Sequence, residues 1–209
     1  MSPRGTSRYV TAGLEAFPAG VARAVEAALE LDFELSVHPA TGGLLAELAA
    51  QCGPGALLAE TGTGTGVGVA WLASTAPADA HIVSIELDPT RAAAARKVHA
   101  DDARVEIITG SAHDLWSRGP FDLLVLDGGP GAGKDDAPPI DPRAVLAPTG
   151  VVVIDDFTPT EEYPPRFAGE IDQVRLHWLE HPDLATEDRV VAPDMAVLIG
   201  RPVGPDARA

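Results

Sequence analysis

The sequence predicts an α/β fold in which a mostly parallel sheet of seven strands is covered by helices on both faces. Short apolar runs alternate with helical patterns along the chain, and runs such as LLVL and VVVI are apolar at successive positions. Such runs are typical of parallel strands that are buried on both faces. The last two apolar runs are instead joined directly at Pro193-Asp194, which predicts an antiparallel C-terminal hairpin.

The size of the chain fits one domain. It has 209 residues, of which 45% are hydrophobic and 22% are charged, as in an ordinary globular protein with a sizeable core. Residues 1–18 are polar and punctuated by Pro and Gly, so we expect a flexible arm there. We expect residues 19–209 to form a single domain, with N-terminal helices over 19–53 and an α/β core over 54–203.

The charge is strongly acidic, with 15 Lys and Arg against 31 Asp and Glu and a formal net charge of −16. Such a field repels phosphate groups, so we expect neither nucleic acid nor membrane partners. The first residues lack the apolar segment of a signal peptide, and no run approaches the roughly 20 apolar residues of a membrane span. The one cysteine, Cys52, excludes an internal disulfide. We therefore expect a cytoplasmic protein.

Two helices are expected before the core. Residues 20–35 place apolar side chains at helical spacing. A second helix follows Thr41, its expected N-cap, and stops at Gly53-Pro54.

Strands and helices then alternate to the end of the chain. The expected parallel strands cover residues 56–60, 81–88, 104–110, 121–127 and 150–156. The expected helices between and after them cover 67–75, 89–100, 111–116, 142–146 and 171–179. Residues 187–203 read as the closing hairpin.

A glycine-rich turn follows the first strand, which ends at Glu60. Gly62, Gly64, Gly66 and Gly68 alternate with small residues, and an apolar helix comes next. Glycines allow positive φ and let a ligand approach the backbone closely, and the helix N-terminus offers free N–H groups. This pattern predicts a binding site for a nucleotide-like cofactor.

Two common nucleotide patterns fit poorly. The NAD pattern G-x-G-x-x-G fails because the sixth position holds Val or Trp in every register. The sequence of residues 128–135 is similar to that of an ATP-binding loop, but Asp135 occupies the position of the Ser or Thr whose hydroxyl should bind Mg²⁺. Pro138 and Pro139 also disfavour the helix that should begin there.

A third pattern fits. Glu60-x-Gly62-x-Gly64-x-Gly66, with Glu86 at the end of the second strand, resembles the S-adenosylmethionine (AdoMet) site of class I methyltransferases. The resemblance covers residues 39–203 and is closest to the small cation-dependent O-methyltransferases of the catechol and caffeoyl-CoA type. The segments HPATGGLLAEL, VEIITGSAHDLW and LDGG…GVVVIDD add to it. It implies a Rossmann-like class I methyltransferase fold, a small hydroxylated, for example aromatic, substrate and a homodimer.

The resemblance also implies which residues bind AdoMet. Glu86 would accept hydrogen bonds from the ribose hydroxyls, and Glu60 with the glycines would face the amino-acid end. Ala112 and His113 would border the adenine, with Trp116 packing nearby, although the order Ser-Ala-His departs from the family's usual acid or Ser in this turn. The implied cofactor residues are Glu60, Gly62, Thr63, Gly64, Gly66, Glu86, Leu87, Ala112, His113 and Asp127.

The relatives bind Mg²⁺ through acids that follow strands four and five, and here these positions are Asp127, Asp155 and Asp156. Strand ends lie on the rim where open α/β sheets bind ligands, and hard oxygen ligands suit Mg²⁺ or another divalent cation such as Ca²⁺. The same acids also occur as caps or substrate contacts in metal-free methyltransferases. Both interpretations stay open at this point.

The catalytic residues implied are Asp127 and a base. Catechol-type relatives carry a Lys shortly after the strand-four Asp, whereas here the nearest is Lys134, in a longer glycine loop. Lys134 is thus the candidate base, with a solvated loop residue as the alternative and His38 and His177 as other bases. A metal-independent methyltransferase, an aminopropyltransferase-like enzyme and an inactive nucleotide-binding module are the alternative functions. The three intact acids argue against loss of catalysis.

Overall fold

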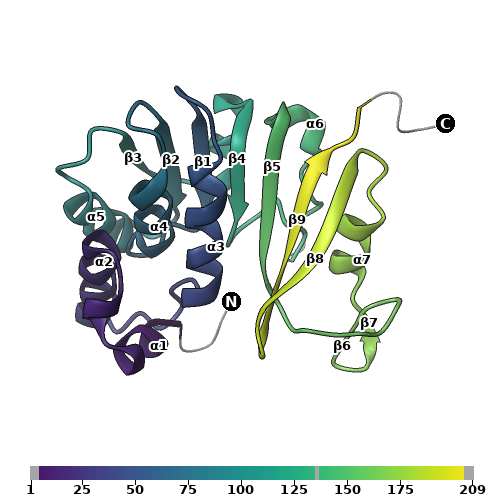
Figure 1. The fold of residues 1–209 in the computed structure, drawn as a ribbon, viewed down its shortest axis with the longest axis horizontal. Helices are drawn as coiled ribbons and strands as arrows, with labels where there is room; N and C mark the ends of the chain where they lie inside the picture. Colours follow the sequence, from purple (N-terminus) through teal and green to yellow (C-terminus); the bar gives the residue numbers. More distant parts are fainter. Residues whose placement is uncertain (1–4, 135–136, 205–209) are drawn as a thin grey trace.

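The computed structural model describes residues 5–134 and 137–204. Its main sheet has seven strands in the order β3-β2-β1-β4-β5-β9-β8 (Figure 1), which confirms the predicted fold class. The strands are β1 (Leu57–Thr61), β2 (His81–Glu86), β3 (Val105–Thr109), β4 (Phe121–Leu126), β5 (Leu146–Phe157), β8 (Leu184–Ala192) and β9 (Met195–Pro202).

The strand order places the ligand site. β1 pairs in parallel with β2 on one side and with β4 on the other. Successive strands β1, β2 and β3 are thus added on one side, and β4 and β5 on the other, so the strand order switches between β1 and β4. Open α/β sheets bind ligands outside the carboxyl ends of the strands at such a point. The hairpin is antiparallel as predicted: β9 pairs with both β5 and β8.

Helices cover both faces of the sheet, as Figure 1 shows. Alternate residues of β4 explain why: Leu123 and Val125 join the core under α2–α5, whereas Leu124 and Leu126 join the core that includes residues of α6 and α7. The helices are α1 (Gly5–Ala12), α2 (Ala19–Glu30), α3 (Pro39–Ala50), α4 (Val67–Thr75), α5 (Pro89–Val98), α6 (Pro142–Val145) and α7 (Gln173–Leu179). Short 3₁₀ helices cover 14–16, 112–114 and 116–118, and β6 (Arg166–Phe167) pairs with β7 (Glu170–Ile171).

The expected flexible arm is wrong for residues 5–16, which form α1 and a 3₁₀ turn packed on the domain. Tyr9 is fully buried, donates a hydrogen bond to the Val37 carbonyl (3.0 Å) and accepts one from Trp71 Nε1 (2.9 Å). The polar composition predicted a flexible arm, but these polar side chains form hydrogen bonds with the rest of the fold. Residues 1–4 of that arm lie outside the described residues.

Two further expectations differ in detail. α3 begins at Pro39 with His38 as its N-cap, whose Nδ1 accepts a hydrogen bond from the Ala40 amide. Thr41 is therefore not the cap: it is buried inside the helix and donates to Asp155 Oδ1 at 3.2 Å. Near the C-terminus, Ile171 belongs to β7 rather than to the helix. Among the described residues, none of the helices has the length and apolar character to cross a membrane.

Candidate functional site

The turn between β1 and α4 can be made only by glycine. Gly62, Gly64 and Gly66 have φ of 81°, 54° and 92°, a region that side chains disfavour. A Cβ on Gly64 would lie 2.7 Å from the Phe33 ring, and one on Gly66 would lie 2.7 Å from His99 Nε2. The turn therefore lies tightly between α5 and the segment that follows α2.

A cavity of about 300 Å³ opens beside this turn. It is bordered by the ends of β1, β2 and β4, the turn after β3 and residues 33–35. Six of the residues expected to bind cofactor line it: Gly62, Gly64, Glu86, Leu87, Ala112 and Asp127. A smaller recess shares Gly62, Gly64 and Asp127 with it and adds Glu60 and Thr63.

Two of the expected residues, Gly66 and His113, line neither the cavity nor the recess. Gly66 lies against His99, whose Nε2 is 3.0 Å from the Gly66 carbonyl oxygen. His113 is exposed, and its Nδ1 lies 3.1 Å from Ser111 Oγ. Trp116 packs near Gly131 instead of lining the cavity. Of the predicted adenine border, Ala112 alone is in the cavity wall.

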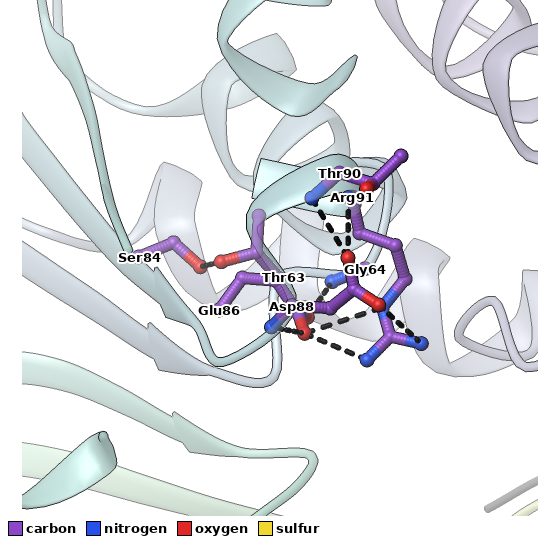
Figure 2. Close-up of polar contacts among 7 residues, drawn as sticks. All are labelled: Thr63, Gly64, Ser84, Glu86, Asp88, Thr90 and Arg91. Atoms are coloured by element: carbon purple, nitrogen blue, oxygen red, sulfur yellow. Dashed lines mark hydrogen bonds and ion pairs between the residues drawn. The ribbon is translucent and has the colours of Figure 1, made fainter. Parts of the chain in front are cut away.

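Glu86 ends β2 with its carboxylate turned into the glycine turn (Figure 2). Its Oε2 accepts a hydrogen bond from the Gly64 amide at 2.8 Å, and its Oε1 accepts one from the Asp88 amide at 2.9 Å. Arg91 Nη2 and Nε also donate to Oε1, at 2.9 and 3.2 Å. Glu86 thus ties the glycine turn to the start of α5.

Glu60 lies beneath the turn in a chain of polar groups. Ser84 Oγ donates to Glu60 Oε2 at 2.8 Å and is itself 2.6 Å from Thr63 Oγ1. Burial is the main cause that raises the pKa of Glu60 to about 8. A Cβ on Gly68 would lie 1.8 Å from Glu60 Oε1, so the fourth glycine makes room for this side chain.

Asp127, Asp155 and Asp156 converge beside the cavity, with one carboxylate oxygen of each within 4.8 Å of the others. Burial, followed by repulsion from Asp155, raises the pKa of Asp127. Burial, followed by repulsion from Asp156, raises that of Asp155. Asp155 Oδ2 is buried without a hydrogen-bond partner among the described residues. A hard cation would both neutralise these carboxylates and satisfy that oxygen.

Lys134 reaches this acidic cluster from the loop after β4, so it does not simply point into solvent. Its ammonium donates to the backbone carbonyls of Asp155 and Asp156 and lies 4.2 Å from the centroid of the Phe157 ring. Burial lowers the pKa of Lys134, and the nearby carboxylates oppose that shift. His177 of α7, by contrast, packs against Trp178 and against His181, which follows the helix.

Sequence reasoning did not single out several residues that line the cavity, among them Phe33, Leu35 and Arg91. Phe33 and Leu35 line the cavity from the irregular segment after α2, which ends at Glu30, so the helix predicted through these two residues is wrong there. Arg91 lines it from the first turn of α5. A cation there was a readable signal, because the helix dipole disfavours positive charge in that turn.

Comparison with known proteins bears on the same region. Residues 59–157 match a family of proteins described as a methyltransferase domain. The chain is 34% identical over 102 residues to a protein of Mycobacterium tuberculosis described as a probable O-methyltransferase, covering 46% of this chain and 45% of that one. It is 35% identical over 103 residues to a catechol O-methyltransferase of Niastella koreensis, covering 44% and 46%. The matches thus span about half the length of these relatives.

Solved structures agree on the fold. The O-methyltransferase TomG of Streptomyces achromogenes, in complex with SAM, superposes with a TM-score of 0.67 at 22% identity and covers 98% of this chain and 100% of its own. An O-methyltransferase of Bacillus cereus, in complex with SAH, gives 0.67 at 18% identity and covers 96% and 98%. Residues 59–157 therefore resemble a methyltransferase domain, and the chain has the same fold as these solved O-methyltransferases.

Proposed function

We propose that the protein is an AdoMet-dependent O-methyltransferase that acts on a small hydroxylated molecule. The observation that carries this proposal is the position of Asp127. Its side chain belongs to the acidic cluster, and the residue also lines both the main cavity and the smaller recess beside the glycine turn. A methyl donor in the cavity and an acceptor oxygen at the cluster would therefore be neighbours.

The donor side of the site is formed by the glycine turn and the end of β2. Gly62 and Gly64 offer backbone without side chains, and Glu86 is the acceptor for ribose hydroxyls. Glu60 and Thr63 line the recess next to it, where the amino-acid end of AdoMet would lie. When bound, AdoMet supplies an activated methyl group, so the protein mainly aligns the reactants and excludes water.

On the acceptor side, Asp127, Asp155 and Asp156 would hold a divalent cation such as Mg²⁺. The unpartnered Asp155 Oδ2 and the mutual repulsion of the three acids support this assignment. The cation would supply charge stabilisation for the acceptor oxygen. Lys134 is the residue that would take the hydroxyl proton, since burial lowers its pKa and thereby favours the neutral amine that a base requires.

Calorimetry with S-adenosylhomocysteine tests the donor site. We expect binding of this compound and none of NAD or ATP. Glu86→Ala should weaken the affinity about tenfold or more, because charge-assisted hydrogen bonds are lost. Binding of ATP alone, or an unchanged affinity of the variant, would contradict the assignment.

Turnover of catechol-like acceptors, followed with and without EDTA, tests the cation. Activity should disappear with EDTA and return with Mg²⁺, and Asp155→Asn should abolish that return. Lys134→Ala should lower kcat at neutral pH and be partly rescued at high pH, where hydroxide removes the acceptor proton.

A metal-independent methyltransferase is the second candidate, and one contact favours it. The Lys134 ammonium already lies at the acidic cluster and opposes the rise in the pKa of Asp127 that burial and the neighbouring acids cause, so a lysine could supply the positive charge that a cation would bring. In that case EDTA would leave turnover unchanged and Lys134→Ala would abolish it.

A further inference from the structure

The two carboxylate oxygens of Glu86 are used unequally within the chain (Figure 2). Oε1 accepts three hydrogen bonds, one from the Asp88 amide and two from Arg91. Oε2 accepts one, from the Gly64 amide. A carboxylate offers about two acceptor sites on each oxygen. Oε1 is therefore filled by the chain itself, and Oε2 has room for one more donor.

Arg91 is held at Glu86 from two sides. Its guanidinium forms a salt bridge with Glu86, whose side chain is only 6% exposed. The ring of Phe33 lies on another side, with 5.1 Å between its centroid and Arg91 Cζ. Phe33, Glu86 and Arg91 all line the main cavity.

The place of Arg91 in α5 makes this contact informative. Arg91 is the third residue of the helix, where the partial positive charge of the helix N-terminus disfavours a cation. Asp88 caps the helix and lies 3.9 Å from the guanidinium, so it offsets part of that cost. The main compensation comes from the Glu86 carboxylate, which belongs to the cavity wall.

Resting on the proposed function, we propose that Arg91 limits Glu86 to one ribose acceptor, Oε2, and so makes the two ribose hydroxyls of the cofactor contribute unequally to binding. One hydroxyl meets an acceptor oxygen with a free site, and the other meets an oxygen whose sites are taken. Arg91 is then a specificity-determining residue. As a result, removing one ribose hydroxyl should weaken binding strongly, whereas nucleosides altered at the other hydroxyl should bind almost as well.

The test is calorimetry of the full chain with S-adenosylhomocysteine and with its 2′-deoxy and 3′-deoxy analogues. With the wild-type protein, one analogue should bind about tenfold more weakly than the parent compound and the other within about twofold of it. In Arg91→Ala the freed Oε1 accepts the second hydroxyl. The second analogue should then also bind about tenfold more weakly than the parent compound does to that variant.

Lys97→Ala is the matched control, because Lys97 is an exposed cation on the same helix. It removes the same charge and should keep the wild-type pattern. Arg91→Lys provides a second variant should Arg91→Ala fold poorly. Lysine keeps the charge but cannot donate the two hydrogen bonds that Arg91 gives to Oε1. Oε1 then has a free acceptor site, so deleting the second hydroxyl should weaken binding more than it does in the wild type.

Equal losses with both analogues in the wild-type protein would overturn the inference. An unchanged pattern in both Arg91 variants would overturn it as well. Failure of the proposed function looks different, because the wild-type protein would then not bind S-adenosylhomocysteine at all, before any analogue is compared.

Discussion

At the scale of single residues, the site is dominated by carboxylates whose side chains are almost fully buried. Glu60 is 1% exposed, Glu86 5% and Asp155 1%. The energetic cost of burying each of these three carboxylates is compensated in a different way. Glu86 is paired with Arg91, Asp155 belongs to a cluster suited to a cation, and Glu60 has hydrogen bonding from Ser84 and a raised pKa.

The buried proton of Glu60 makes stability depend on pH. Its pKa rises from 4.5 to about 8 on folding, so between these values the native state holds a proton that the unfolded chain has released. Ionisation therefore favours the unfolded state, and the contribution of Glu60 falls as pH rises through this window and is lowest above its upper end. Glu60→Gln removes this dependence.

Urea unfolding of both proteins near pH 5 and near pH 8 checks this prediction. The free energy of unfolding of Glu60→Gln relative to the wild type should increase by at least about 1 kcal/mol between the two conditions. A difference that is independent of pH would mean that Glu60 ionises normally in the folded protein.

At the scale of elements, the start of α4 is shaped by what lies beneath it. Gly68 is inside the helix, where glycine normally costs stability, yet a Cβ there would collide with Glu60 Oε1 at 1.8 Å. Gly43 in α3 is the matched case, because a Cβ there meets nothing within 4 Å. The same substitution should therefore have opposite signs in the two helices.

Gly43→Ala should stabilise the protein by about 0.5–1 kcal/mol, the cost of a glycine within a helix. Gly68→Ala should destabilise it by about 1–3 kcal/mol through overpacking. It should also weaken binding of S-adenosylhomocysteine, since Glu60 lines the recess. Chemical denaturation of the two variants measures both effects, and equal signs would contradict the packing described for Glu60.

Tyr9 is the buried aromatic residue that helps to attach helix α1 to the domain, and its contribution can be measured. Tyr9→Phe leaves the Val37 carbonyl and the Trp71 indole N–H without their buried partner, which should cost about 1–3 kcal/mol of unfolding free energy. Tyr163 is the control: it is 70% exposed and its hydroxyl donates to Glu180. Tyr163→Phe should change the free energy by no more than about 0.5 kcal/mol.

At the scale of the whole molecule, the net charge of −16 opposes folding through self-repulsion. Ion pairs such as Arg175 with Asp188 offset this locally but leave the excess acid in place. Raising NaCl from about 0.01 M to about 1 M shortens the screening length from roughly 30 to 3 Å. We therefore expect Tm in scanning calorimetry to rise with salt, and a Tm that falls would show that the ion pairs outweigh the repulsion. The single domain and the homodimer stay predictions.

The parts of the fold that could be predicted are those that depend on residues close together in the sequence. The alternation of apolar runs gave the sheet and its closing hairpin, and Pro89 marked the start of α5 correctly. The acids after β4 and β5 could be placed on one rim because parallel strands end at one edge of a sheet. Gly68 was seen as part of a glycine repeat, but its partner Glu60 could not be inferred from spacing.

The sequence by itself therefore determined the class of fold, the glycine turn and the set of acids near it, because each depends on local periodicity or on strand ends. Only the tertiary structure brought Arg91 onto Glu86 beside Phe33, Lys134 onto the carbonyls of Asp155 and Asp156, and α1 onto the domain. These contacts depend on the paths of loops and on the order of strands. Except for Glu86 and Arg91, which are five residues apart, the partners are distant in the chain, and no local sequence pattern predicts such contacts.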